Sequence, residues 1–211
     1  MASAPALDAW LVWSNHLRNG RPPETLSQSW LSHWNYPQEE SAFGLANCAR
    51  GFGSPLSGSF ANPLPSGSQA IGRAAFWGLA FHGQPEKAAE YAYYDASLDH
   101  AGSGVAVAVA VAKMIAITTP ETSFPDYVRV ITRILPSSSP LLKVLPDIIS
   151  RIETEDGPRQ IRLITQDKLG VADELDANRT LAWILAGLGQ LRQGFGPAIL
   201  ATAGCGGAID H

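Results

Sequence analysis

Ser66–Met114, which reads SGSQAIGRAAFWGLAFHGQPEKAAEYAYYDASLDHAGSGVAVAVAVAKM, is the stretch that decides the fold. A Gly/Ser turn leads into a first helix that carries Arg73, and Pro85 lies in the first turn of a second helix, where proline is favoured. The alternating Val/Ala run 105–117 is too long for an ordinary strand, and alanine is a poor strand former. We therefore expect three consecutive helices, the last of them buried.

Outward from this stretch, the apolar residues recur at helical spacing, and glycine and proline separate the segments. Thr25 and Gln28 form a capping-box pattern, Ser123 is placed to cap a helix, and Pro146 is expected to kink one. The range 51–68, rich in Gly, Ser and Pro, is expected to be an irregular loop. The predicted helices span 7–18, 25–34, 39–50, 69–81, 85–98, 105–117, 124–135, 140–152, 158–168, 176–192 and 197–204. No βαβ or hairpin pattern occurs, so the sequence predicts one compact all-α domain over residues 1–211.

The composition narrows the classes of protein. Charged residues make up 16% of the 211 residues, below the usual quarter, and the net charge is −4. Without a basic run, nucleic acid is not an expected partner. The longest apolar run, 105–112, is too short to cross a membrane, and no signal peptide is seen. Cys48 and Cys205 form neither a disulfide framework nor a metal pattern, which favours a reducing, cytoplasmic setting.

Several short segments occur in an ordered series along the chain. They are Trp30-Leu-Ser-His-Trp34, Asn62-Pro63, Ser66-Gly-Ser-Gln-Ala-Ile-Gly-Arg73, Phe76-Trp77-Gly78, Gly83-Gln-Pro-Glu-Lys-Ala-Ala89, Asp95-Ala-Ser-Leu-Asp-His100, Asn178 in a late apolar helix, and Gly206-Gly-Ala-Ile-Asp210. Each is weak alone. In this order and spacing, from about residue 7 to the end, the series resembles the ADP-ribosylglycohydrolase family.

The resemblance implies an all-helical fold with two magnesium ions at the bottom of a cleft, and cleavage of ADP-ribose from a modified side chain or a related conjugate. Carboxylates and metal would then stabilise an oxocarbenium-like state. The chain departs from the family's metal motifs and is shorter at both ends. Ser3-Ala-Pro-Ala6 stands where the family has Thr-Asp-Asp-Thr, and Asp210 alone remains of the late Gly-Gly-Asp-Thr-Asp motif. Because magnesium needs several oxygen ligands, Asp210 alone does not predict the metal pair.

Asp95, Asp99 and His100 are the candidate catalytic residues. On a helix, the two aspartates are i, i+4 neighbours, so one carboxyl pKa would rise and give an acid/base pair, with His100 as a switchable partner. The resemblance places His100 in the cleft, with Asp99 replacing a threonine of the family. The alternative is a solvated helix end, where a histidine cation suits the helix dipole.

The candidate ligand-binding residues lie in Gly-rich turns and at one arginine. Small residues let backbone amides approach a ligand, and a guanidinium suits a phosphate or carboxylate. The set is Ser66, Gly67, Ser68, Arg73, Gly102, Gly206 and Gly207. The alternative is ordinary helix punctuation for the turns and a frayed tail for the end of the chain.

Three functions remain open from sequence. The chain is an active ADP-ribosyl hydrolase with a rebuilt metal site, a non-catalytic ADP-ribose-binding pseudoenzyme, or a metal-independent enzyme that uses Asp95, Asp99 and His100 on another small molecule. We also expect a homo-oligomer, since an apolar chain trimmed at both ends would expose a patch where helices packed.

Overall fold

The computed structural model describes residues 39–152, 154, 157–169 and 176–205. Within these ranges every regular element is a helix and no strand occurs, which confirms the all-α prediction. The α-helices are α2 (Glu39–Ala49), α3 (Leu56–Ser59), α4 (Gln69–Ala80), α5 (Pro85–Ala96), α6 (Ser103–Ile117), α7 (Phe124–Ile134), α8 (Pro140–Arg151), α9 (Gly157–Lys168), α10 (Ala177–Gln190) and α11 (Phe195–Gly204), and a 3₁₀ turn spans Leu191–Gln193. The helices predicted over 7–18 and 25–34 lie outside the described residues.

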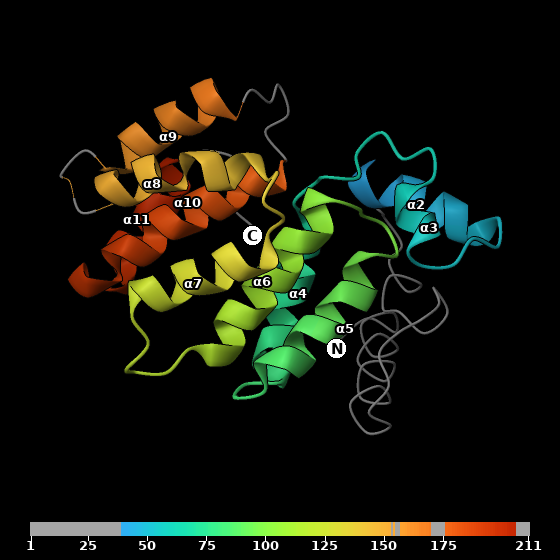
Figure 1. Cartoon of the computed structure of the whole chain (residues 1–211), viewed down its shortest axis with the longest axis horizontal. Helices are drawn as coiled ribbons and strands as arrows, with labels where there is room; N and C mark the ends of the chain where they lie inside the picture. Colours follow the sequence, from blue (N-terminus) through green and yellow to red (C-terminus); the bar gives the residue numbers. More distant parts are fainter. Residues whose placement is uncertain (1–38, 153, 155–156, 170–175, 206–211) are drawn as a thin grey trace, which may run out of the picture.

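The helices form two groups around a central set (Figure 1). The green helices α4, α5 and α6 occupy the middle, α2 and α3 lie on one side, and α7 to α11 lie on the other. None of the helices in the described ranges has the length and apolarity needed to span a bilayer.

One hydrophobic cluster joins α4, α5 and α6. Its large side chains are Trp77, Phe81 and Tyr91, whose rings contact one another, and the remaining members are mostly alanines. Alanine adds little bulk, so the three helices approach closely and the aromatic rings fill the space that is left. This packing holds α4 and the end of α5, which carry Arg73 and Asp95, in one rigid group.

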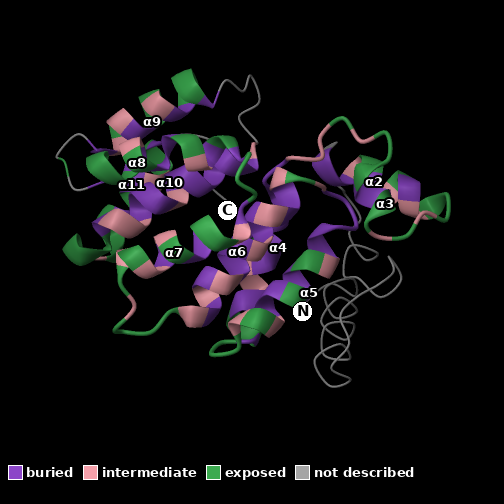
Figure 2. Cartoon of the chain, in the orientation of Figure 1, coloured by how far each residue is buried: buried purple, intermediate pink, exposed green. Residues whose placement is uncertain are grey.

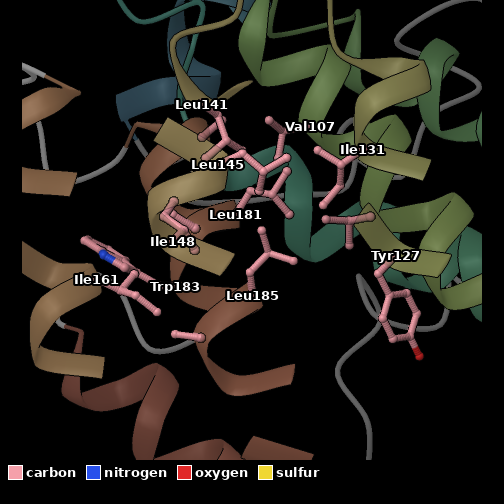
Figure 3. Packing of buried hydrophobic residues seen from close by; sticks show 14 of the residues in the cluster. Val107, Tyr127, Ile131, Leu141, Leu145, Ile148, Ile161, Leu181, Trp183 and Leu185 are labelled. Atoms are coloured by element: carbon pink, nitrogen blue, oxygen red, sulfur yellow. The ribbon is translucent and has the colours of Figure 1, made fainter. Parts of the chain in front are cut away.

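A second, larger cluster joins α6 to the helices α7 to α10 (Figure 3). Leu181 and Leu185 of α10 lie at its centre, and Ile148 of α8 packs against them. Because α6 also contributes Val107 and Val111 to this cluster and alanines to the first, it is buried on two faces. The buried positions drawn in Figure 2 follow α6 and α10 along most of their lengths. The expectation of a buried helix over 105–117 is thus confirmed.

The structure corrects two local expectations. The range 51–68 is not wholly irregular, because it contains the short helix α3. Helix α5 ends at Ala96, two residues earlier than predicted, so Asp99 lies in the turn that follows. Helix α8 contains Pro146 and ends at Arg151, in agreement with the predicted helix over 140–152. The cap at Ser123 is confirmed, with Asp126 completing a capping box.

Candidate functional site

Arg73 lies at the centre of a buried group of polar side chains. Its Nε donates to Asp95 Oδ2 at 3.2 Å, and its Nη1 donates to Asp99 Oδ2 at 2.8 Å. Its Nη2 donates to the other oxygen of Asp99, so the guanidinium meets that carboxylate with two parallel bonds. All three side chains are almost wholly buried. We call the full set, Glu40, Ser41, Gln69, Arg73, Asp95, Asp99 and His100, the polar network.

Asp99 accepts hydrogen bonds at both carboxylate oxygens. Besides the two bonds from Arg73, Ser41 Oγ donates to Oδ2 at 2.6 Å, and His100 Nδ1 lies 2.8 Å from Oδ1. Burial alone would raise the pKa of this carboxyl, but the positive charges of Arg73 and His100 outweigh it and hold the pKa well below its usual range. Asp99 is therefore a fixed anion at neutral pH.

His100 has a carboxylate at each ring nitrogen. Nδ1 faces Asp99, and Nε2 lies 3.1 Å from Oε2 of Glu40. An imidazole donates at both nitrogens only when it is protonated. Burial lowers the pKa of His100, but the charge of Asp99 and the hydrogen bonds of the ring to both carboxylates more than offset this and raise it. The two carboxylates thus favour the protonated form of the ring, and the ring has no exposed surface.

The side chain of Glu40 packs against the Gly/Ser turn 66–68, which the sequence predicts to contact a ligand. Its Oε2 accepts from the backbone N–H of Gln69 at 2.9 Å, at the start of α4. The carboxylate also packs directly on Gly67, where any Cβ would collide with it. The hydroxyl of Ser41, the next residue, also lies within hydrogen-bonding distance of the side-chain oxygen of Gln69. The first residues of α2 are therefore bonded to the start of α4.

The helix α3 and the loop after it contact the backbone of residues 99–100. Gly58 packs so closely on His100 that a Cβ there would collide with the carbonyl oxygen. Asn62 reaches across with Nδ2 to the carbonyl oxygen of Asp99 at 2.9 Å. The backbone of the 99–100 turn is thereby held between α3, the loop after it and the central helices.

The remaining residues predicted to bind a ligand differ in exposure: some are buried in the protein and one lies on its surface. Gly67 and Ser68 are buried, and the carbonyl oxygen of Ser66 accepts from the N–H of Ala177 at 3.0 Å. Gly102 is exposed, at the N-cap of α6. Gly206, Gly207 and Asp210 lie outside the described residues. The turn at 66–68 is accordingly a packed junction between α4 and α10.

The predicted rise of one carboxyl pKa in the Asp95/Asp99 pair does not occur at Asp99, whose pKa is lowered. The two aspartates do lie close together, but Asp99 follows the helix, and Arg73 bridges them. The buried Arg73 favours the ionised form of Asp99, whereas two unshielded carboxylates would repel. The alternative of a solvated helix end is wrong, since Asp99 and His100 are fully buried.

Glu40, Ser41 and Gln69 are the members of the polar network that sequence reasoning missed. Glu40 lies sixty positions before His100, its partner. In the sequence it is one of two acids at the start of a helix, where acidic residues are ordinary. No local pattern distinguishes it from its neighbour.

A cleft of about 610 Å³ borders the polar network. Its lining includes His100 and Gly102, the hydroxyl of Ser59, the half-exposed ring of Tyr93, and Ile134 from α7. We call it the His100 cleft. Its size lies within the range of small-molecule sites, and its lining combines apolar side chains with a few polar groups.

The family resemblance implies a pair of magnesium ions held by carboxylates. Within the described ranges, no group of three or more His, Cys, Asp or Glu side chains is arranged to hold a metal ion. The carboxylates of the polar network already face Arg73 and His100. Ser3-Ala-Pro-Ala6 and Asp210, the positions on which the magnesium expectation rests, lie outside the described residues.

Comparison with known proteins places the chain in a family. The family model described as ADP-ribosylglycohydrolase matches residues 5–211, which is nearly the whole chain. No curated protein and no solved structure matches significantly. The ordered segments, the all-helical fold and the match over residues 5–211 agree: the chain belongs to the ADP-ribosylglycohydrolase family.

Proposed function

We propose that this protein binds ADP-ribosyl groups in the His100 cleft and does not use Asp95, Asp99 or His100 as acid/base catalysts on them. The observation that carries the proposal is the closed bonding of the network beside the cleft. Both nitrogens of His100 and both oxygens of Asp99 bond to protein groups, and neither side chain is exposed. A general acid or base must reach the proton that it transfers.

The same observation ranks the three functions that sequence left open. Metal-independent catalysis by this trio is disfavoured, because both ring nitrogens of His100 face carboxylates of the protein and Asp95, Asp99 and His100 are all buried. Metal-dependent hydrolysis is disfavoured as well, because Ser3-Ala-Pro-Ala6 and Ala208 stand where the family's metal motifs have aspartates. Family membership supports the ligand class, so ADP-ribosyl binding without turnover is the function that remains.

Tyr93 is the cleft residue best suited to an adenine ring. It is 43% exposed and lines the cleft, and its ring is held edge-on against Tyr94. An aromatic side chain that stacks on a base contributes about 1–3 kcal/mol. The floor beneath it is apolar, with Val105 and Val109 of α6. A nucleotide with its base on Tyr93 would also reach the backbone at Gly102.

The test is a calorimetric titration of ADP-ribose into the purified protein, first with magnesium and then with a chelator. We expect the same affinity in both conditions and no hydrolysis of an ADP-ribosylated peptide. Tyr93→Ala should weaken binding about tenfold, since a lost stack of about 1.4 kcal/mol is a factor of ten. Phe43→Ala is the matched control, because Phe43 is 41% exposed and does not line the cleft. Magnesium-dependent turnover would replace this proposal with an active hydrolase, and absence of binding in both conditions would end it.

The homo-oligomer remains a proposal, and α11 supports it. Phe195, Ile199 and Leu200 are 76%, 52% and 73% exposed on this one short helix. Exposed apolar patches of this kind mark interaction surfaces. We expect light scattering at micromolar concentration to give a mass above 22.4 kDa for the wild type and 22.4 kDa for a Phe195→Glu/Leu200→Glu variant. Leu163→Glu on α9, at a residue 50% exposed, is the control. A monomeric wild type would refute the idea.

A further inference from the structure

A second cleft, of about 360 Å³, lies between α5, α6 and α7. Three cations line it: Lys113 on α6, and Arg129 and Arg133 on α7. The two arginines are four residues apart and thus share a face of their helix. Val130 and Ile134 of α7 provide apolar lining between them. We call it the Arg133 cleft.

The concentration of positive charge here departs from the rest of the chain. The protein has 15 Lys and Arg residues against 19 acids, yet three of the cations line this one cleft against two acids. Asp126 is engaged in the capping box with Ser123 and pairs with Arg129 at 2.9 Å. Within the described ranges, Arg133 takes part in no ion pair. The cleft therefore keeps a cation that no carboxylate neutralises.

The one acid facing Lys113 is itself easily displaced. Glu86 Oε1 lies 2.6 Å from Lys113 Nζ, but the glutamate side chain is 83% exposed, whereas the lysine is 18% exposed. An exposed ion pair contributes little free energy. A ligand that brings its own negative charge can take the place of this carboxylate without leaving a buried charge unpaired.

We propose that the Arg133 cleft is a binding site for a phosphate group, with Arg133 and Arg129 on one wall and Lys113 on the other. A guanidinium offers the forked donors that match phosphate oxygens, and an ammonium binds phosphate as a point charge. Three cations around one cavity suit a dianion better than a monocarboxylate. This site is separate from the polar network and does not depend on ADP-ribosyl binding.

The Arg133 cleft adjoins the His100 cleft. Ile134 lines both cavities. On α6, Ala106 and Val109 line the His100 cleft, and Lys113 and Ile117 line the Arg133 cleft at the following turns of the same face. The phosphate can therefore belong either to a separate small molecule or to the far end of a ligand that lies in both cavities.

The first experiment titrates inorganic pyrophosphate into the full chain by calorimetry. Arg133→Gln should weaken binding about tenfold, and Arg151→Gln, at an exposed arginine at the end of α8, should leave it unchanged. Glu86→Gln should tighten binding several-fold, because the competing carboxylate is gone. A gain of affinity cannot come from misfolding, so this variant protects the test from an unstable protein.

The two sources of phosphate are separated by repeating the titration with ADP-ribose. A loss for Arg133→Gln with both probes would identify the phosphate as part of the ADP-ribosyl ligand, and a loss with pyrophosphate alone would identify a separate phosphorylated molecule. The proposal is overturned if pyrophosphate fails to bind the wild type at millimolar concentration. It is equally overturned if Arg151→Gln loses as much affinity as Arg133→Gln, since the binding would then be general surface attraction.

Discussion

Replacing Arg73 by methionine is expected to lower the free energy of unfolding by about 3–5 kcal/mol, the usual cost of removing one partner from a buried ion pair. Methionine keeps most of the length of the side chain but leaves Asp95 and Asp99 without their shared cation. Both carboxylates are almost wholly buried, so water cannot replace the guanidinium. Urea denaturation followed by circular dichroism gives the free energy.

A second substitution tests whether the unpaired buried carboxylates cause the stability loss of Arg73→Met. Adding Asp99→Asn to Arg73→Met should restore part of the lost stability, because a neutral amide no longer needs a cation, and a double-mutant cycle measures the coupling. Arg151→Met, at an exposed arginine, should stay within about 0.5 kcal/mol of the wild type. A loss below about 1 kcal/mol for Arg73→Met would mean that water reaches the network in solution.

Trp77→Ala is the second substitution with a large expected effect, about 3–5 kcal/mol of unfolding free energy. Trp77 has no exposed surface and contacts three rings, with centroids 5.1 Å away for Phe76, 6.3 Å for Phe81 and 5.1 Å for Tyr91. Removing the indole leaves a cavity that these rings fill only in part.

Leu79→Ala provides the comparison on the same helix, since Leu79 is 68% exposed. Its denaturation midpoint should lie close to that of the wild type, while the midpoint of Trp77→Ala should fall with an unchanged slope. Equal midpoints for the two variants would contradict the packing of the first cluster. A changed slope would mean that the variant alters the compactness of the folded or unfolded state.

Much of the helical framework could be predicted because its signals are local. Pro85 marks the start of α5 because its fixed φ suits the first helical turn. Ser123 marks the start of α7 through its capping box with Asp126. The Val/Ala run of α6 could be assigned by length and composition. The end of α5 was misjudged by two residues because the turn at Ser97–Asp99 carries no glycine or proline.

The polar network could be predicted only as a set of residue types. Arg73, Asp95, Asp99 and His100 were singled out, but their burial and their pairing depend on tertiary packing, which no spacing rule contains. Arg73, 26 positions before Asp99, lowers the pKa of that carboxyl. The spacing rule considers only Asp95, four positions away, which would raise it. Glu40 was missed for the same reason.

Ile134 lines both clefts, so the side chain that borders one cavity also borders the other. A ligand that shifts Ile134 in one cleft changes the shape of the other. If a phosphate in the Arg133 cleft changes the affinity of the His100 cleft by some factor, a ligand in the His100 cleft must change the affinity for phosphate by the same factor. The two cavities would then behave as one cooperative unit, whose response to either molecule depends on the concentration of the other.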